Sequence, residues 1–336
     1  MMRRVLITGA AGFVGINLVR GFAEAGWNVI ATARRDPDPL TTAFLAPVSE
    51  RVTWQMGDVN DERWLDRLVA GGALDTIVHA AAITPTDSVE RGATRQVVDT
   101  NLVATLSVLE AVRSHDVPRL LFASSSGIYA GAARHAPRRE DEVLEPHNLY
   151  ALCKFASERL VSAYVALHGC SAASVRIGSV YGPMERATRS RTGLSVVASL
   201  VAAAAASRPT RVSHPDVGRD LIHAYDVAQA FVRLAEASHL RWGVYNLAGG
   251  VPLTVETVLD ELTWLTGVPW TPSDIDEADV VLTPGHHRDP VDLTRLETDT
   301  GFTPEIALRD GLAHAISWHR SAGDLDSVAR FAFRPG

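Results

Sequence analysis

The N-terminal part of the chain reads Val5-Leu6-Ile7-Thr8-Gly9-Ala10-Ala11-Gly12-Phe13-Val14-Gly15. A short apolar run with strand character is followed by a glycine-rich turn that opens a helical pattern. Glycines in this setting allow a tight turn and let the backbone approach a pyrophosphate, while the helix N-terminus is directed at the phosphates. The stretch therefore predicts a dinucleotide-binding turn made by Gly9, Ala11, Gly12, Phe13, Val14 and Gly15.

Short β-branched runs alternate with helical patterns through the first half of the chain. The runs begin at Val5, Val29, Val52, Thr76, Leu120 and Ala173, and the main helical segments span residues 15–25, 93–114 and 150–168. This alternation predicts an α/β fold with a doubly wound, Rossmann-type parallel sheet.

After residue 178 the pattern becomes less regular, and strand and helix patterns return near Asp226 and Val244. We therefore expect a dinucleotide-binding domain of residues 1–178 and 219–250. A smaller, discontinuous C-terminal substrate-binding domain is expected to comprise residues 179–218 and 251–336.

Composition excludes several classes of partner. The chain has 336 residues and a net charge of −7, so it lacks the overall basic character of proteins that bind nucleic acid or anionic membranes. Its two cysteines, Cys153 and Cys170, cannot form a disulfide framework, which fits a reducing compartment. The apolar run at residues 5–7 is too short for a signal peptide, and the run at residues 194–206 is too short to cross a bilayer. We expect a cytoplasmic protein.

A metal site is not expected. Adjacent histidines such as His286 and His287 point apart in most backbones, and no cysteine or carboxylate cluster accompanies them.

The end of the second predicted strand bears on the coenzyme. An acidic residue there binds the ribose 2′-hydroxyl of NAD, whereas arginine accommodates the 2′-phosphate of NADP. This chain has Arg34 and Arg35 at that place, which favours NADP. The nearby Asp36 keeps NAD as the alternative, and two adjacent arginines can also be solvated loop charges.

Three further positions each have two interpretations. Asp58 follows the third strand and either meets an adenine amino group or caps the helix near Asp61. Residues Ala80, Ala81 and Ala82 follow the fourth strand and suit either close approach of a ribose or tight packing. Asn101, inside a long helix, either satisfies a neighbouring backbone or is exposed.

Tyr150 and Lys154 form a candidate acid/base pair. Their spacing of four residues on a helix places both side chains on one face, where an ammonium can stabilise a phenolate. The three serines at residues 124–126 lie between the glycine turn and this pair in chain order, so three parts of a hydride-transfer site are present. The alternative is that the serines form a polar strand end and that Tyr150 is a core residue.

Together these residues resemble the extended short-chain dehydrogenase/reductases, also called the NAD-dependent epimerase/dehydratase family. The resemblance covers nearly the whole chain. It is carried by Thr8–Gly15, Gly57-Asp58, His79–Ala82, Asn101, Ser124–Tyr129, Tyr150–Lys154, Val180–Pro183, Arg219–His223 and Val244–Asn246.

The resemblance implies that Ser125, Tyr150 and Lys154 are catalytic. Tyr150 would exchange a proton with the substrate oxygen, which requires its pKa to fall from the usual value of about 10. Lys154 would promote that shift and hold the ribose hydroxyls, and Ser125 would hydrogen-bond the reacting oxygen. The resemblance also implies coenzyme contacts by Arg34, Arg35, Asp58, Val59, Ala80, Ala81, Ala82, Asn101, Ile177, Ser179 and Val180, and substrate contacts by Thr84, Ser125, Ser126, Gly127, Ser179, Arg219 and Arg288.

The chain departs from the family at two of these positions. Gly127 stands where the family dehydratases carry a glutamate, so dehydration is not expected. Ser179 replaces the asparagine that contacts the diphosphate in many nucleotide-sugar epimerases. Arg219 matches an arginine that often binds this diphosphate, and Arg288 lies near another such position.

Arg186, Arg189 and Arg191 add charge to the loop that lines the substrate pocket, or are solvated. A nucleotide sugar, a free sugar acid and another small hydroxy compound all fit these arginines.

We therefore expect an NAD(P)-dependent oxidoreductase that transfers hydride reversibly at a secondary alcohol of a sugar, sugar acid or nucleotide sugar. NADP-type residues suit a coenzyme that exchanges with the cellular pool, which favours a dehydrogenase or reductase. A nucleotide-sugar epimerase with retained NAD is the alternative, and a non-catalytic NADPH-sensing protein is a third possibility. The resemblance further implies a homodimer through a four-helix bundle of residues 93–114 and 150–168.

Overall fold

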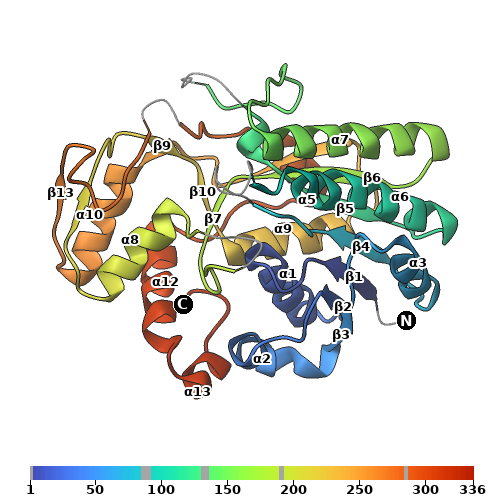
Figure 1. Cartoon of the computed structure of the whole chain (residues 1–336), viewed down its shortest axis with the longest axis horizontal. Helices are drawn as coiled ribbons and strands as arrows, with labels where there is room; N and C mark the ends of the chain where they lie inside the picture. The colour runs from blue at the N-terminus through green and yellow to red at the C-terminus, as the bar shows by residue number, and fades with distance from the viewer. Residues whose placement is uncertain (1–2, 85–91, 130–135, 189–192, 284–286) are drawn as a thin grey trace.

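The computed structural model describes residues 3–84, 92–129, 136–188, 193–283 and 287–336. Seven parallel strands form the central sheet in the order β11-β6-β5-β4-β1-β2-β3 (Figure 1). They are β1 Arg4–Thr8, β2 Asn28–Ala33, β3 Val52–Met56, β4 Thr76–His79, β5 Leu120–Ser125, β6 Ala172–Ile177 and β11 Val244–Leu247. The strand order reverses between β1 and β4, which is the switch point where doubly wound sheets bind ligands. The predicted Rossmann-type fold is confirmed.

Helices cover both faces of the sheet because successive residues of each buried strand point to opposite sides. In β1, Val5 and Ile7 belong to one hydrophobic core and Leu6 to another. The first core is closed by the packed helices α1 (Phe13–Glu24) and α9 (Ala224–Glu236). The second is closed by α3 (Glu62–Ala70), α6 (Ala104–Ser114) and α7 (Leu149–His168).

The helix predicted at residues 93–114 is present but irregular. It consists of α5 (Thr94–Val98), a π-helical turn η2 (Asp99–Val103) and α6. Turns of this kind are frequently found at functional sites. Here the turn contains Asn101, whose side chain is 1% exposed and therefore points into the protein.

A second group of elements lies to one side of the sheet (Figure 1). Helices α8 (Val196–Ala205), α10 (Val255–Thr266) and α12 (Leu308–Ser321) share a third hydrophobic core. Three strand pairs join this group: β7 Ser179–Tyr181 with β10 Leu221–His223, β9 Gly218–Arg219 with β12 Leu253–Thr254, and β8 Thr210–Val212 with β13 Trp270–Pro272. Three short helices are also described: α2 (Pro39–Leu45), α11 (Thr294–Thr300) and α13 (Leu325–Ala329).

The last residues of the chain pack against the first hydrophobic core. Phe331 and Phe333 pack into the first core, where Phe333 contacts Phe44 edge to face. Arg20 of α1 donates hydrogen bonds to the carbonyl oxygens of Phe44 (3.0 Å) and Phe331 (2.7 Å). Burial of these aromatic side chains stabilises the packing of the C-terminal segment on the first core. The sequence could not predict this packing, because two isolated aromatic residues show no helical or strand periodicity.

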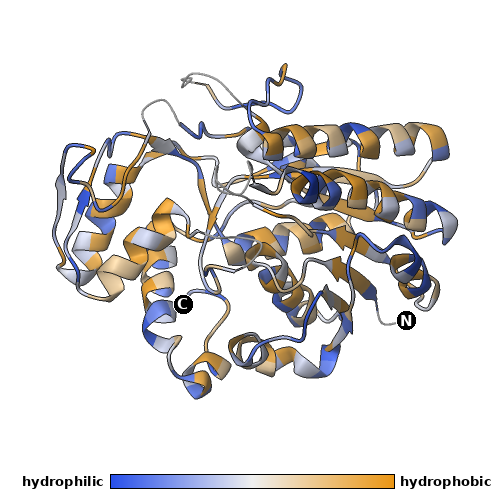
Figure 2. Ribbon diagram, viewed as in Figure 1, coloured by the Kyte–Doolittle hydropathy of each residue, from blue (hydrophilic) through white to orange (hydrophobic). Residues whose placement is uncertain are grey.

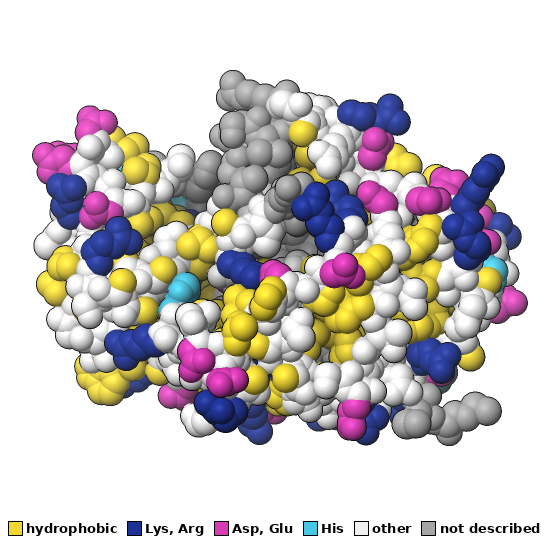
Figure 3. Space-filling model, turned by 60° about the horizontal axis from the view of Figure 1, so that its bottom comes forward, with side chains coloured by type: hydrophobic (Ala, Val, Ile, Leu, Met, Phe, Trp, Pro, Cys, Tyr) yellow, Lys and Arg dark blue, Asp and Glu magenta, His cyan; other side chains and the backbone are white. Residues whose placement is uncertain are grey.

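The surface carries charges of both signs. On the face shown in Figure 3, Lys and Arg side chains are interspersed with Asp and Glu rather than gathered by sign. Figure 2 shows hydrophobic residues in the sheet and along much of α7. Within the described residues, no helix combines the length and the apolar character needed to cross a membrane.

Candidate active site

One large cavity lies at the carboxyl ends of β1, β4, β5 and β6. Its volume of about 1380 Å³ exceeds the roughly 300–1,000 Å³ of pockets for drug-sized ligands, so it has room for a dinucleotide and a second molecule. The predicted site residues that line it are Gly9, Ala11, Gly12, Phe13, Val14, Gly15, Arg34, Arg35, Asp58, Val59, Ala80, Ala81, Ala82, Thr84, Ser125, Ser126, Gly127, Tyr150, Lys154, Ile177, Ser179, Val180, Arg219 and Arg288.

The glycine turn is shaped by close backbone contacts. Gly9 has a φ of +68°, and a Cβ there would lie 2.6 Å from the nitrogen of Ala81. A Cβ at Gly15 would lie 2.1 Å from the carbonyl oxygen of Gly9. Gly12 caps α1 without a side-chain hydrogen bond, and the first turn contains no acidic residue. The positive end of the helix dipole therefore faces the cavity, an arrangement that fits the pyrophosphate of a dinucleotide.

Thr8 holds the neighbouring turn in place. Its hydroxyl accepts hydrogen bonds from the backbone nitrogens of Ala80 and Ala81, both at 3.2 Å, and lies 2.7 Å from Nδ1 of His79. Burial, assisted by the charge of Lys154, lowers the pKa of His79 to about 3, so the imidazole is neutral. Sequence reasoning did not assign Thr8, although its position directly before the glycines was a usable signal.

Asn101 is not among the residues that line the cavity, and its contact with the coenzyme stays a prediction. Its Oδ1 accepts a hydrogen bond from the nitrogen of Ile83, and its Nδ2 donates to the oxygen of the same residue, both at 2.8 Å. The amide is fully occupied in satisfying a backbone segment, which was one of the two interpretations. Asn101 thus positions the segment that carries Ile83 and Thr84 into the cavity.

Asp58 does not cap α3. The cap is Asp61, which accepts a hydrogen bond from the nitrogen of Trp64 at 3.0 Å. Asp58 instead accepts from both nitrogens of Asn60 and lines the cavity. Its contact with adenine stays a prediction.

Arg186 lies at the coenzyme end of the cavity. It donates hydrogen bonds to Asp38 (2.6 Å) and Thr41 (3.0 Å), at the N-terminus of α2 and close to Arg34 and Arg35 in sequence. Arg186 lines the cavity, and its role toward the substrate stays a prediction. Sequence reasoning did not assign its carboxylate partner, Asp38. Arg189 and Arg191 lie outside the described residues.

Lys154 is held rigidly beneath the cavity. The side chain is 2% exposed, and its ammonium donates a hydrogen bond of 2.7 Å to the carbonyl oxygen of Ala123. The ammonium lies 5.8 Å from the centre of the Tyr150 ring. Burial lowers the pKa of Lys154 to about 8, although Cys153 and Glu158 oppose the shift. A cation is thus fixed next to the tyrosine.

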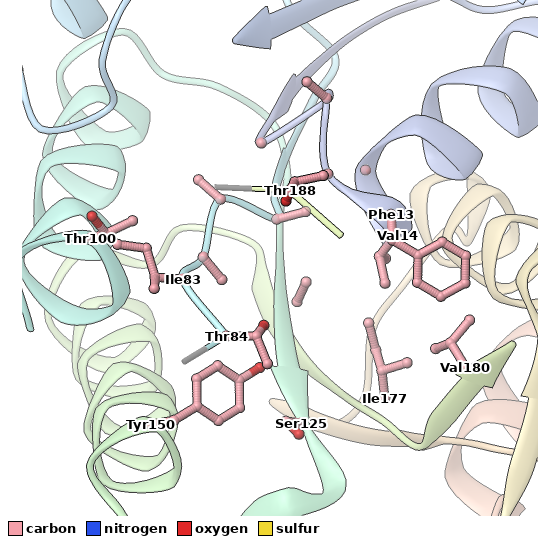
Figure 4. A pocket seen from close by; sticks show the side chains of 18 of the residues that line it. Phe13, Val14, Ile83, Thr84, Thr100, Ser125, Tyr150, Ile177, Val180 and Thr188 are labelled. Atoms are coloured by element: carbon pink, nitrogen blue, oxygen red, sulfur yellow. The ribbon is translucent and has the colours of Figure 1, made fainter. Parts of the chain in front are cut away.

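Ser125 and Tyr150 face the same part of the cavity. Ser125 ends β5, and its hydroxyl accepts a hydrogen bond from the nitrogen of Gly127 at 3.0 Å. Figure 4 shows the Tyr150 phenol directed toward Thr84 and toward the end of β5 at Ser125. A hydroxyl, a phenol and a buried ammonium therefore meet at one edge of the sheet, as hydride transfer to or from an alcohol requires.

A buried polar network supports this edge and was missed from the sequence. Glu158, one turn beyond Lys154, accepts hydrogen bonds from Ser124 (2.6 Å) and from Arg176 (2.8 Å). Arg176 also donates to the hydroxyl of Tyr129, which donates in turn to Asn246 of β11. The network joins the strand that ends at Ser125 to the helix that carries Tyr150.

Arg219 and Arg288 both line the cavity and lie close enough for their charges to interact. Burial and, to a lesser extent, the charge of Arg288 lower the pKa of Arg219 to about 10. Burial also lowers the pKa of Arg288, which the Tyr150 phenolate opposes. The two guanidinium groups thus give the cavity wall a positive charge close to Tyr150.

The side chain of His287 contacts the backbone of β9. Nδ1 of His287 accepts a hydrogen bond from the nitrogen of Gly218 at 2.9 Å, and His286 lies outside the described residues. In the part of the chain that the structure describes, no three His, Cys, Asp or Glu side chains are grouped so that they could hold a metal.

Comparison with known proteins agrees with this geometry. The profile of the NAD dependent epimerase/dehydratase family matches residues 5–248. The chain is 28% identical to a dTDP-glucose 4,6-dehydratase of Streptomyces niveus, over 94% of the chain and 93% of that protein. It is also 28% identical to a dTDP-4-dehydro-6-deoxy-D-allose reductase of a Streptomyces species, over 95% and 96%. A solved complex of Thermus thermophilus UDP-glucose 4-epimerase with NAD is 25% identical and superposes with a TM-score of 0.79, over 95% and 99%.

Proposed function

The chain belongs to the NAD-dependent epimerase/dehydratase family, and from this premise we propose that it transfers hydride reversibly at a secondary alcohol of a sugar, sugar acid or nucleotide sugar. The observation that carries the proposal is the meeting of Ser125, Tyr150 and Lys154 in the cavity that the glycine turn also lines. The third alternative, a non-catalytic sensor, is disfavoured because all three side chains are present and aligned.

Each residue has a separate task in this proposal. When bound, the coenzyme supplies a nicotinamide ring that accepts or returns the hydride. Tyr150 takes the proton from the substrate hydroxyl and gives it back in the reverse direction. Lys154 stabilises the phenolate by its fixed charge, and Ser125 donates a hydrogen bond to the reacting oxygen. Val59, Ile177, Ser179 and Val180 would pack around the coenzyme, with Thr84, Ser126 and Gly127 on the substrate side.

The reaction proposed is oxidation and reduction without loss of water. A dehydratase needs a second acid/base beside the sugar ring, and the corresponding position here is Gly127. The groups around Gly127 are the Ser125 hydroxyl and the Arg288 guanidinium rather than a carboxylate. We further propose that residues 1–178 and 219–250 form the dinucleotide-binding domain and that residues 179–218 and 251–336 form the substrate-binding domain.

The function is tested by following a hydride from labelled coenzyme into product. The purified protein is incubated with 4-deuterated NADH or NADPH and ketosugars, and separately with NAD⁺ or NADP⁺ and sugars, sugar acids or nucleotide sugars. Deuterium gained by a ketosugar, or reduction of added coenzyme, supports a dehydrogenase or reductase. Interconversion of two epimers without net coenzyme reduction supports the epimerase. No turnover with any of them, by protein that binds the coenzyme, would contradict the proposal.

NADP is the proposed coenzyme, supported by Arg34 and Arg35 on the cavity wall with Arg186 nearby. Replacing Arg34 and Arg35 by Ala is expected to raise the Kd for NADPH about 10- to 100-fold, since hydrogen bonds between charged groups contribute about 1.5–3 kcal/mol. The Kd for NADH should change less than threefold, as fluorescence titration will show. Equal weakening for both coenzymes, or NAD released by the denatured wild-type protein, would instead favour an epimerase with retained NAD.

A homodimer through residues 93–114 and 150–168 is also proposed. It is supported by apolar side chains exposed on these packed helices, among them Val103, Leu106, Leu152 and Leu167, of which Leu167 is 75% exposed. Sedimentation should give twice the chain mass of 36.2 kDa, and a single-chain mass would exclude the dimer.

A cytoplasmic location is proposed as well, supported by two free cysteines.

A further inference from the structure

The position of Gly127 brings two functional groups close to one point. A Cβ built on Gly127 would lie 3.1 Å from the hydroxyl oxygen of Ser125. The same atom would lie 3.4 Å and 3.6 Å from Nη1 and Nη2 of Arg288. The glycine therefore leaves open the space that the guanidinium of Arg288 enters, directly beside the hydroxyl that is proposed to hold the reacting oxygen.

The positive charge of Arg288 is not neutralised by its neighbours. The backbone of Arg288 is anchored by its nitrogen to the oxygen of Gly218 at 3.0 Å. Its guanidinium makes no hydrogen bond or ion pair with any residue that the structure describes. The adjacent Asp289 pairs with Arg138 at 2.8 Å instead. A second cation, Arg219, lies close enough for the charge of Arg288 to lower its pKa.

The other nearby carboxylate, Asp220, is turned away from the cavity wall. Its two oxygens accept hydrogen bonds from the backbone nitrogens of Gly250 and Val291, both at 2.9 Å. Burial raises the pKa of Asp220 to about 7, which further reduces the negative charge that it offers. The guanidinium of Arg288 therefore has no counter-charge among the described residues, and a bound anion would supply one.

We propose that Arg288 binds a carboxylate of the substrate that is attached within two or three bonds of the carbon on which Tyr150 acts. The substrate is then a sugar acid, either free or linked to a nucleotide. This inference rests on the proposed function, because it takes Ser125 as the residue that holds the reacting oxygen.

The distance between the reacting oxygen and the anion of the substrate distinguishes a carboxylate on the sugar from a more distant phosphate. Hydrogen bonds of about 3 Å must join Ser125 to the reacting oxygen and Arg288 to its anion. Both groups lie within 3.6 Å of the same point at Gly127, so a substrate whose anion and reacting oxygen are close neighbours can bind to both at once. A carboxyl group on the ring carbon next to the reacting one meets this condition. A diphosphate lies across the sugar ring from the reacting oxygen, which suits two adjacent groups less well.

The chemistry of the guanidinium suits this role. Its planar fork of donors matches the two oxygens of a carboxylate, which gives geometric specificity that a lysine lacks. Binding at this point would also fix the orientation of the ring relative to Ser125. Gly127 would then act as a specificity-determining residue, because any side chain there competes with the guanidinium for space.

The test compares matched ligands that differ only in a carboxylate. Isothermal titration of the coenzyme-loaded protein measures the Kd of glucuronate against glucose and of UDP-glucuronate against UDP-glucose. The wild-type protein should prefer the acid in at least one pair by tenfold or more. Arg288→Met should reduce that preference at least tenfold, and Arg288→Lys should restore only part of it. The Kd of the neutral ligand should change less than twofold.

Two further variants complete the test. Gly127→Ala should also reduce the preference, since only the Ser125 hydroxyl and the flexible end of Arg288 lie near the new methyl group. Arg233→Met removes an exposed arginine of α9 and should leave the preference unchanged.

Equal weakening of acid and neutral ligands by Arg288→Met would overturn the inference, because Arg288 would then bind the diphosphate. No preference for the acid, or no binding of any of the four probes, would also overturn it.

The same titrations separate this inference from the proposed function. Turnover of sugars without a preference for the acid contradicts only the role of Arg288. A preference that depends on Arg288, in a protein that transfers no hydride, contradicts only the proposed reaction.

Discussion

Replacement of Tyr150 by Phe is expected to lower the rate of hydride transfer by about 10²- to 10⁴-fold, the usual contribution of a positioned acid or base. The change removes only the phenolic oxygen, which Figure 4 shows directed toward Ser125 and Thr84. Lys154 would remain fixed by its hydrogen bond to Ala123, so the coenzyme should still bind. Single-turnover reduction, followed by coenzyme absorbance, measures the step directly.

Tyr164 provides a matched control for this substitution. It lies on the same helix α7, but its hydroxyl donates a hydrogen bond to Glu110, away from the cavity. Tyr164→Phe should therefore keep the wild-type rate. A Tyr150→Phe protein that binds coenzyme normally and retains more than a tenth of the wild-type rate would rule out Tyr150 as the acid/base.

Replacement of Glu158 by Gln is expected to lower the free energy of unfolding by about 3–5 kcal/mol, because it removes the carboxylate that neutralises the buried charge of Arg176. Arg176 and Glu158 are 3% and 2% exposed, and two of their hydrogen bonds measure 2.8 and 3.1 Å. Urea denaturation monitored by tryptophan fluorescence gives the loss as a lower midpoint at unchanged slope.

Two comparisons isolate the buried pair as the cause. Glu261→Gln breaks an exposed pair with Arg309 and should cost less than about 1 kcal/mol. Adding Arg176→Met to Glu158→Gln should recover part of the loss, because the uncompensated charge is removed. An unchanged midpoint for Glu158→Gln would mean that the two side chains do not pair in solution.

The sequence predicted features that depend on local pattern. The strand, turn and helix of residues 5–25 follow from apolar spacing and from glycines that only a tight turn requires, and β1 and α1 lie there. The spacing of Tyr150 and Lys154 placed both on one helix, as α7 confirms. These features need no knowledge of distant parts of the chain.

Features that join distant segments could not be predicted in this way. The amide of Asn101 binds the backbone of Ile83, and Arg186 binds Asp38 across 148 positions of sequence. The pairing of Glu158 with Arg176 depends on how α7 lies against β6. Each contact is set by tertiary packing, so the residue type alone leaves several partners open.

The return of the C-terminal residues to the first core has a consequence for synthesis of the protein. The carbonyl of Phe331 meets Arg20 across 311 positions of sequence, and Phe333 covers Phe44. At about 5–20 residues per second, a ribosome needs roughly 15 to 60 s to make the intervening chain. Until then the ring of Phe44 lacks its contact with Phe333. Nascent chains halted before residue 331 should therefore depend on chaperones more than the finished protein does.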